Sequence, residues 1–109
     1  MLKSRNGGLP RSRSKRRETY VFQLFVAGHE SNSALARANL ARVCDEHLAG
    51  RYRLKVVDVL ENAAAALAHR VLVTPTLLVA GPHFKVTLLG NLSDTKDVLA
   101  ALHLIGGKP

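Results

Sequence analysis

The chain has 109 residues, of which 47% are hydrophobic, so it can form one small packed domain but is too short for two. It contains no apolar run near the ~20 residues of a membrane span, no apolar signal-peptide core at its N-terminus, and one cysteine, which cannot form an internal disulfide. We therefore expect a cytoplasmic protein with no membrane association. The net charge of +8 suggests a polyanion partner until its distribution along the chain is considered.

The positive charge is concentrated at the N-terminal end. Residues 1–17 contain seven Lys and Arg and no acidic residue, which leaves nine basic against eight acidic residues in the remainder. This stretch is rich in Gly, Ser and Arg and has few large apolar side chains, so we expect residues 1–18 to be a disordered basic tail and residues 19–107 to form the domain. The tail is either a solvated extension or a weak, salt-sensitive polyanion binder. It has no aromatic residue that could stack on bases.

The first half of the domain predicts a strand, a helix and a second strand. Residues 19–27 are apolar at nearly every position, which predicts a strand covered on both faces. Asn32 or Ser33 is expected to cap a helix that ends near Leu48. Residues 52–60 predict another strand, so this unit is a βαβ motif with parallel strands. The apolar stripe of the helix is expected to contain Ala36, Leu40, Val43, Cys44, His47 and Leu48.

The second half begins with a short helix and a hairpin. Residues 61–70 are rich in alanine and favour a helix, with Asn62 as a possible cap. Residues 75–80 and 84–90 are rich in β-branched and large apolar side chains, and a Gly-Pro-His turn separates them. These features predict a two-stranded hairpin.

The last element is predicted to be a helix over residues 94–105. Ser93 is expected to cap it, Asp94 adds a favourable charge at its N-terminus, and Gly106 and Gly107 are expected to stop it. The complete order is β-α-β-α-β-β-α, which is that of the thioredoxin fold, an α/β fold with a mixed sheet. The face expected to be buried contains Val98, Leu99, Leu102 and Ile105.

Enzyme chemistry has no visible site in this sequence. A thioredoxin carries its reactive cysteines at the start of the first helix, but residues 29–32 contain no sulfur and the chain has no Cys-x-x-C. Cys44 lies on the apolar stripe and is expected to be buried and inert. His29 and Glu30 could form an acid–base pair, but a solvated loop is the favoured interpretation. No histidines or cysteines occur at metal-ligand spacing, so we expect no catalytic residue, metal or cofactor.

Four segments in order resemble the KaiB family of circadian clock proteins. They are YVFQLFVAG followed by NS, then LKVVDVLEN, then TPTL, then GNLSD, and the match runs from about Tyr20 to Leu104. The resemblance implies a non-enzymatic protein that docks on the hexameric ATPase KaiC and regulates its phosphorylation cycle. It also implies a possible change of fold in the C-terminal half. In that family the thioredoxin-like form binds KaiC, and a rearranged form assembles as a tetramer.

The sequence departs from the family pattern at several places. Gly90-Asn91-Leu92-Ser93 stands where the family usually has Gly-Asp-Leu-Ser, and Ser31 stands where it commonly has proline. Alanines at 63–66 replace a usual acidic patch. These departures indicate a divergent member, whose partner would be a KaiC homologue or another ATPase and which could be a dimer or tetramer.

Some site residues follow from the resemblance by position. Lys55 matches a strand-two lysine in the family's docking region, and Arg53 lies beside it on the same face of the strand. Tyr20, Gly90 and Asn91 match positions linked to the choice between folds. The structural alternatives are an edge aromatic for Tyr20, a turn for Gly90 and a solvated charge for Lys55. A glycine between a strand and a helix cap can also adopt a positive φ.

Three functions remain open at this stage. The first is a KaiB-like adaptor, in which Pro75 shapes the backbone instead of assisting sulfur chemistry. The second is a thioredoxin-fold redox relic that uses Cys44, and the third is a nucleic-acid-associated protein that acts through its tail. The β-rich character of residues 75–90 favours the thioredoxin-like form as the resting state.

Overall fold

The computed structural model describes residues 19–104 of the chain. The tail predicted over residues 1–18 and the residues after Leu104 lie outside the described residues. The elements follow the predicted order, and their bounds lie within a few residues of those expected except at the end of the last helix. They are β1 (Tyr20–Val26), α2 (Ser31–His47), β2 (Tyr52–Asp58), α3 (Ala63–Ala68), β3 (Thr76–Ala80), β4 (Lys85–Leu89) and α4 (Thr95–Ala101).

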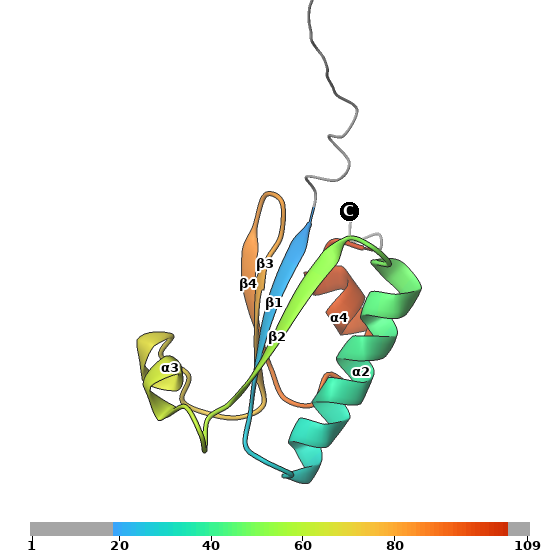
Figure 1. Ribbon diagram of the computed structural model, residues 1–109. Helices are drawn as coiled ribbons and strands as arrows, with labels where there is room; N and C mark the ends of the chain where they lie inside the picture. The colour runs from blue at the N-terminus through green and yellow to red at the C-terminus, as the bar shows by residue number, and fades with distance from the viewer. Residues whose placement is uncertain (1–18, 105–109) are drawn as a thin grey trace, which may run out of the picture.

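The strands form one mixed sheet in the order β2-β1-β3-β4 (Figure 1). β1 and β2 are parallel, from the pair Tyr20 and Tyr52 to the pair Val26 and Asp58. β3 is antiparallel to both β1 and β4. The sheet therefore has β2 and β4 as its outer strands, and the α/β class with a mixed sheet is confirmed.

One face of the sheet is covered by α2 and α4 (Figure 1). Alternate residues of β1 and β3 meet the apolar stripe of α2 there, and the core is fully buried around Phe22, Leu24 and Leu40. The predicted stripe is confirmed at every position except His47, which is exposed, and Leu48 is fully buried as the C-cap residue of α2. Ser33 is also buried on this stripe, which its polarity concealed in the sequence.

The other face of the sheet is largely open. α3 covers only one end of it, where Phe25, Val57 and Ala66 form a small second cluster. Val21, further along β1, is 42% exposed. The expectation that β1 is covered on both faces is therefore wrong for its first half, because α3 has only six residues and is too short to cover the whole sheet.

Two helix caps differ from the predicted ones. The Glu30 carboxylate accepts hydrogen bonds from the Ser33 backbone N–H (3.1 Å) and hydroxyl (2.8 Å), so α2 is capped by Glu30 and not by Asn32 or Ser33. Asp94, not Ser93, caps α4 by accepting from the backbone N–H of Asp97. In both cases the carboxylate bonds the amide three residues later, which is where an N-cap oxygen is required.

The end of α4 also differs from the prediction. The helix stops at Ala101 and does not continue to Gly106, because His103 adopts a left-handed φ of +61°. The Leu104 backbone N–H then donates to the Leu99 carbonyl at 2.9 Å, which closes a Schellman-type C-cap without a glycine. Val98, Leu99 and Leu102 are buried as predicted, whereas Ile105 lies outside the described residues.

Candidate partner-binding surface

The position of the reactive cysteines in a thioredoxin is occupied by a helix cap in this chain. Glu30 and Ser33 bond each other there, and the Ser33 hydroxyl also accepts from the Ala27 backbone N–H at 3.1 Å. Glu30 therefore has a structural role, and His29 is exposed in the same turn. Residues 19–104 contain no group of three or more His, Cys, Asp or Glu side chains placed to hold a metal ion.

The single cysteine lies in the core of the sheet and α2. Cys44 is 0% exposed, as expected from the apolar stripe. Burial, with a smaller contribution from the charge of Asp45, raises the pKa of the Cys44 thiol to about 12. The nucleophilic thiolate is therefore absent at neutral pH, and the buried sulfur cannot meet a substrate.

The open face of the sheet brings the two predicted partner-binding residues together. Arg53 and Lys55 are exposed on β2, two residues apart, and pair in register with Val21 and Gln23 of β1. Neither basic side chain forms an ion pair within residues 19–104. The sequence prediction that they share a face is consistent with this geometry, and their role in binding stays a prediction.

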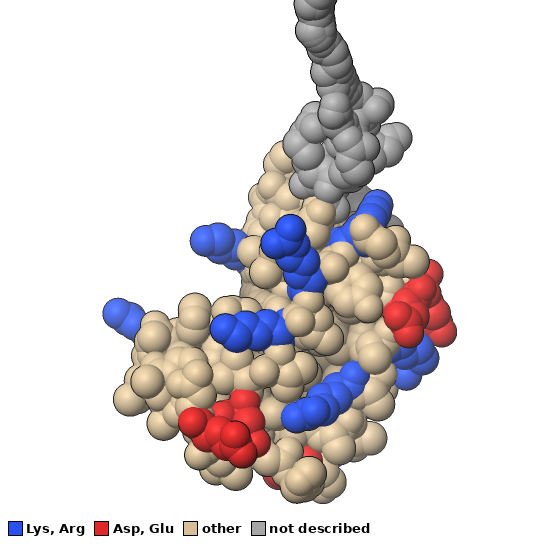
Figure 2. Space-filling model, in the orientation of Figure 1, with Lys and Arg blue, Asp and Glu red and all other residues tan. Residues whose placement is uncertain are grey.

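Charged side chains are unevenly distributed over the molecule. In Figure 2, Lys and Arg are spread over the whole visible face, whereas Asp and Glu gather mostly in two groups, one at the lower left and one at the right. Lys85 of β4 adds a further basic side chain on the open face, in register with Ala80 of β3. The open face thus combines exposed basic groups with apolar surface, which is typical of a protein-binding surface.

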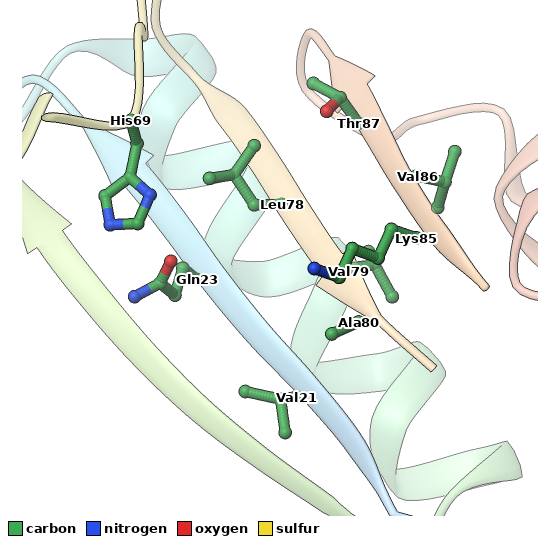
Figure 3. A pocket seen from close by; sticks show the side chains of 9 residues that line it. All are labelled: Val21, Gln23, His69, Leu78, Val79, Ala80, Lys85, Val86 and Thr87. Carbon is green, nitrogen blue, oxygen red and sulfur yellow. The ribbon is translucent and has the colours of Figure 1, made fainter. Parts of the chain in front are cut away.

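A hollow of about 420 Å³ runs over β1, β3 and β4 on this open face (Figure 3). Its floor includes Val21 and Leu78, and Lys85 and Thr87 stand along β4. His69, which follows α3, lines the end of the hollow nearest that helix. The centroid of its ring is 5.6 Å from that of the Phe25 ring. We name this hollow the β3–β4 trough.

Tyr20 is a core residue and not an edge aromatic. It is buried at the start of the inner strand β1, and its hydroxyl donates to the Leu102 carbonyl at 2.9 Å. Its ring contacts those of Phe22 and Phe84, with centroids 6.1 and 6.0 Å away. This residue therefore joins the first strand to the C-terminal end of α4.

Pro75, Gly90 and Asn91 meet at one junction between the sheet and the helices. The Gly90 N–H donates to the Pro75 carbonyl at 3.0 Å. Asn91 donates from its side chain to the Asn32 side chain at 3.1 Å, and its carbonyl accepts from the Asn39 side chain at 2.9 Å. The structure thus links the predicted fold-choice residues to α2 through two asparagines that the sequence reading did not assign to this role.

The backbone at this junction is in unusual conformations. Gly90 has a φ of +95°, as its position between a strand and a cap suggested. Leu92 has a φ of +64° although it carries a side chain, and that side chain is buried. Leu92 was missed because a leucine gives no sequence signal for a left-handed conformation.

Solved structures show that this architecture is thioredoxin-like. Chloroplastic thioredoxin z matches with a TM-score of 0.65 and 20% identity over 82% of each chain. Fasciola hepatica thioredoxin matches with a TM-score of 0.64 and 16% identity, over 82% of this chain and 83% of that one. Identities this low establish the fold alone.

Sequence relatives are much closer. The circadian clock oscillator protein KaiB of Nostoc is 40% identical over 92 residues, which cover 84% of this chain and 85% of that protein. KaiB of Synechococcus elongatus is 39% identical over 92 residues, which cover 84% and 90% of the two chains. The KaiB domain model matches residues 23–104, almost the whole described part of the chain. The chain therefore belongs to the KaiB family of circadian clock proteins.

Proposed function

We propose that this protein is a non-enzymatic regulator that binds a KaiC-type ATPase in the cytoplasm and modulates its phosphorylation and ATPase cycle, in circadian or stress-related signalling. The observation that carries the proposal is the KaiB domain match over residues 23–104. The buried Cys44 and the helix cap at the usual redox position support a binding role over thiol chemistry. Among the described residues, no helix is long and apolar enough to cross a membrane.

The proposed contact surface is the half of the open face that belongs to β2. Arg53 and Lys55 are exposed there, and the edge of β2 is an outer edge of the sheet. Two adjacent cations that form no ion pair among residues 19–104 can form charge-assisted hydrogen bonds with acidic groups of a partner without losing an ion pair within that range.

The test is a binding assay between the full chain and the KaiC-type ATPase of the same source. Replacing both Arg53 and Lys55 by Glu should weaken binding by about tenfold or more, because it reverses two interfacial charges. Arg37→Glu is the matched control, because Arg37 is exposed on α2, on the helix-covered side. The rate of phosphate release by the ATPase should change when the wild-type chain is added.

Two results would contradict this proposal. One is equal binding by the wild-type chain and the Arg53/Lys55 variant, which would remove the surface assignment. The other is the absence of any complex with the ATPase, which would remove the function. Sedimentation of the chain alone would show in addition whether it forms the proposed dimer or tetramer.

A further inference from the structure

A second exposed surface lies beyond the trough, at the end of β4. Leu72 is 91% exposed, Leu89 66% and Val73 53%. Exposed apolar residues of a soluble protein are usually scattered singly over its surface, whereas these three lie together. These three residues line an adjoining hollow of about 350 Å³, which shares His69, Leu78 and Thr87 with the β3–β4 trough. The two hollows are therefore continuous along the open face of the sheet, and together they form the complete β3–β4 trough.

The backbone that presents these apolar side chains is held by hydrogen bonds at both ends. On the N-terminal side of Leu72, the Val71 N–H donates to the Ala66 carbonyl at 2.9 Å. On the C-terminal side of Leu72, the Thr76 hydroxyl donates to the Val73 carbonyl at 2.6 Å. An ordered loop that exposes large apolar side chains is preorganised for binding, because little conformational entropy remains to be lost.

The charge of the trough has one sign. Among the described residues, its lining contains Lys85 towards one end and Arg70 towards the other, and no Asp or Glu. Neither cation forms an ion pair within residues 19–104. An occupant that is apolar in its middle and acidic at an end would therefore complement this surface.

The shape of the occupant follows from the strand beside the trough. β4 pairs with β3 on one side only, so the backbone groups along its other edge have no strand partner among the described residues. Lys85, Thr87 and Leu89 all face the trough, because they alternate along this strand and Lys85 and Thr87 line the first hollow. An added strand would place its own alternate side chains beside these three.

We propose that β4 and its trough bind an extended acidic–apolar segment of a partner protein by strand addition. Apolar side chains of that segment lie beside Thr87 and Leu89 and contact Leu72, and a carboxylate lies near Lys85. This site is on the opposite outer strand from Arg53 and Lys55, so the inference does not rest on the proposed function.

The probe is a capped synthetic hexapeptide, Thr-Leu-Thr-Val-Thr-Glu, titrated to millimolar concentration into the ¹⁵N-labelled full chain. Antiparallel to β4, it places Leu, Val and Glu opposite Leu89, Thr87 and Lys85. Amide shifts should concentrate on residues 85–89, and amides of β4 should exchange more slowly with solvent. Peptides with Lys in place of Glu, and with Ser in place of Leu and Val, should bind several-fold more weakly.

Charge reversal tests the ionic contact. Lys85→Glu should weaken binding of the Glu peptide by up to about fivefold and strengthen binding of the Lys peptide, as expected for one exposed ion pair. Lys96→Glu, on the exposed surface of α4, is the matched control and should change neither affinity.

A second pair of variants tests the apolar contact without affecting the core. Leu72→Ser should reduce peptide binding, whereas Leu67→Ser, which removes a similarly exposed leucine outside the trough, should not. The proposal is overturned if the peptide causes no shifts, if shifts map to β2 instead of β4, or if the Ser-substituted peptide binds equally well. It is also overturned if Leu72→Ser lowers retention on anionic vesicles but leaves peptide binding intact, because the surface would then favour a membrane.

Discussion

Replacing Gly90 by alanine should destabilise the thioredoxin-like arrangement through backbone strain alone. Gly90 has a φ of +95°, and no heavy atom lies within 4 Å of the position that a Cβ would take. The added methyl group therefore meets no neighbour, and its whole cost comes from a conformation that residues with side chains rarely adopt. Steric clash is excluded as a competing explanation.

The size of the effect can be worked out from two opposing contributions. A left-handed conformation costs a residue with a side chain about 1–2 kcal/mol. Alanine also lowers the conformational entropy of the unfolded chain, which increases the free energy of unfolding by about 0.4–1 kcal/mol. The net loss is about 1 kcal/mol, which changes the ratio of two competing states about fivefold, and it would lower the urea midpoint by about 1 M for a domain of this size.

Gly50→Ala is the matched control for this experiment. Gly50 has a φ of +76° and also has nothing within 4 Å of its Cβ position, but it lies between α2 and β2, outside the C-terminal half. Both variants should lose similar stability in urea. Only Gly90→Ala should add a second set of backbone chemical shifts, with residues 76–89 no longer extended, if the family's change of fold applies here. An unchanged midpoint for Gly90→Ala beside a lowered one for Gly50→Ala would refute the strain argument.

Three further predictions concern the core, the thiol and the tail. Tyr20→Phe should cost about 1–2 kcal/mol in urea unfolding, because the buried Leu102 carbonyl loses its donor; an unchanged midpoint would show that this hydrogen bond is energetically neutral. Native Cys44 should resist thiol reagents at pH 8, and rapid labelling of the folded protein would contradict its burial. Because the pKa of Cys44 is raised in the folded state, the stability of the wild type relative to Cys44→Ala should fall as the pH rises from about 9 towards 12. Deleting residues 1–17 should abolish retention on heparin at about 150 mM salt with little change in stability, and retention by the truncated chain would place polyanion binding in the domain.

Element order and the core face could be predicted from the sequence, because both depend on periodicity. The stripe from Ala36 to Leu48 and the alternating strands meet in the structure as expected, and Asn62 caps α3 as proposed. A stripe of apolar residues reports the burial of a whole element, so it tolerates a local error such as His47. The fold class depends on these averaged signals and is therefore the most predictable property.

Caps and helix ends could not be predicted to the residue because they depend on single hydrogen bonds. Asn32 and Glu30 are both plausible N-cap residues near the start of α2. Glu30 is the cap in the structure because its carboxylate accepts from both the backbone N–H and the hydroxyl of Ser33. His103 ends α4 in a left-handed conformation that the sequence would assign to a glycine. The exposure of β1 was missed for a different reason, because an apolar strand does not reveal how far the helix above it extends.

The thioredoxin-like fold of this chain has a helix cap where a thioredoxin has its redox pair. In a thioredoxin the start of the first helix must be open, so that the helix dipole can stabilise a thiolate next to substrate. Here Glu30 carries negative charge to that position and is bonded to Ser33, whose hydroxyl also binds the β1 end at Ala27. A thiolate at this site would be repelled by the carboxylate and would lose the helix amides to it. The same cap holds α2 against the sheet, and Asn32 and Asn39 then bind Asn91 from the ordered helix. The residues at the former redox position therefore close the start of α2 and, through Asn32, bind Asn91 at the junction between the sheet and α4.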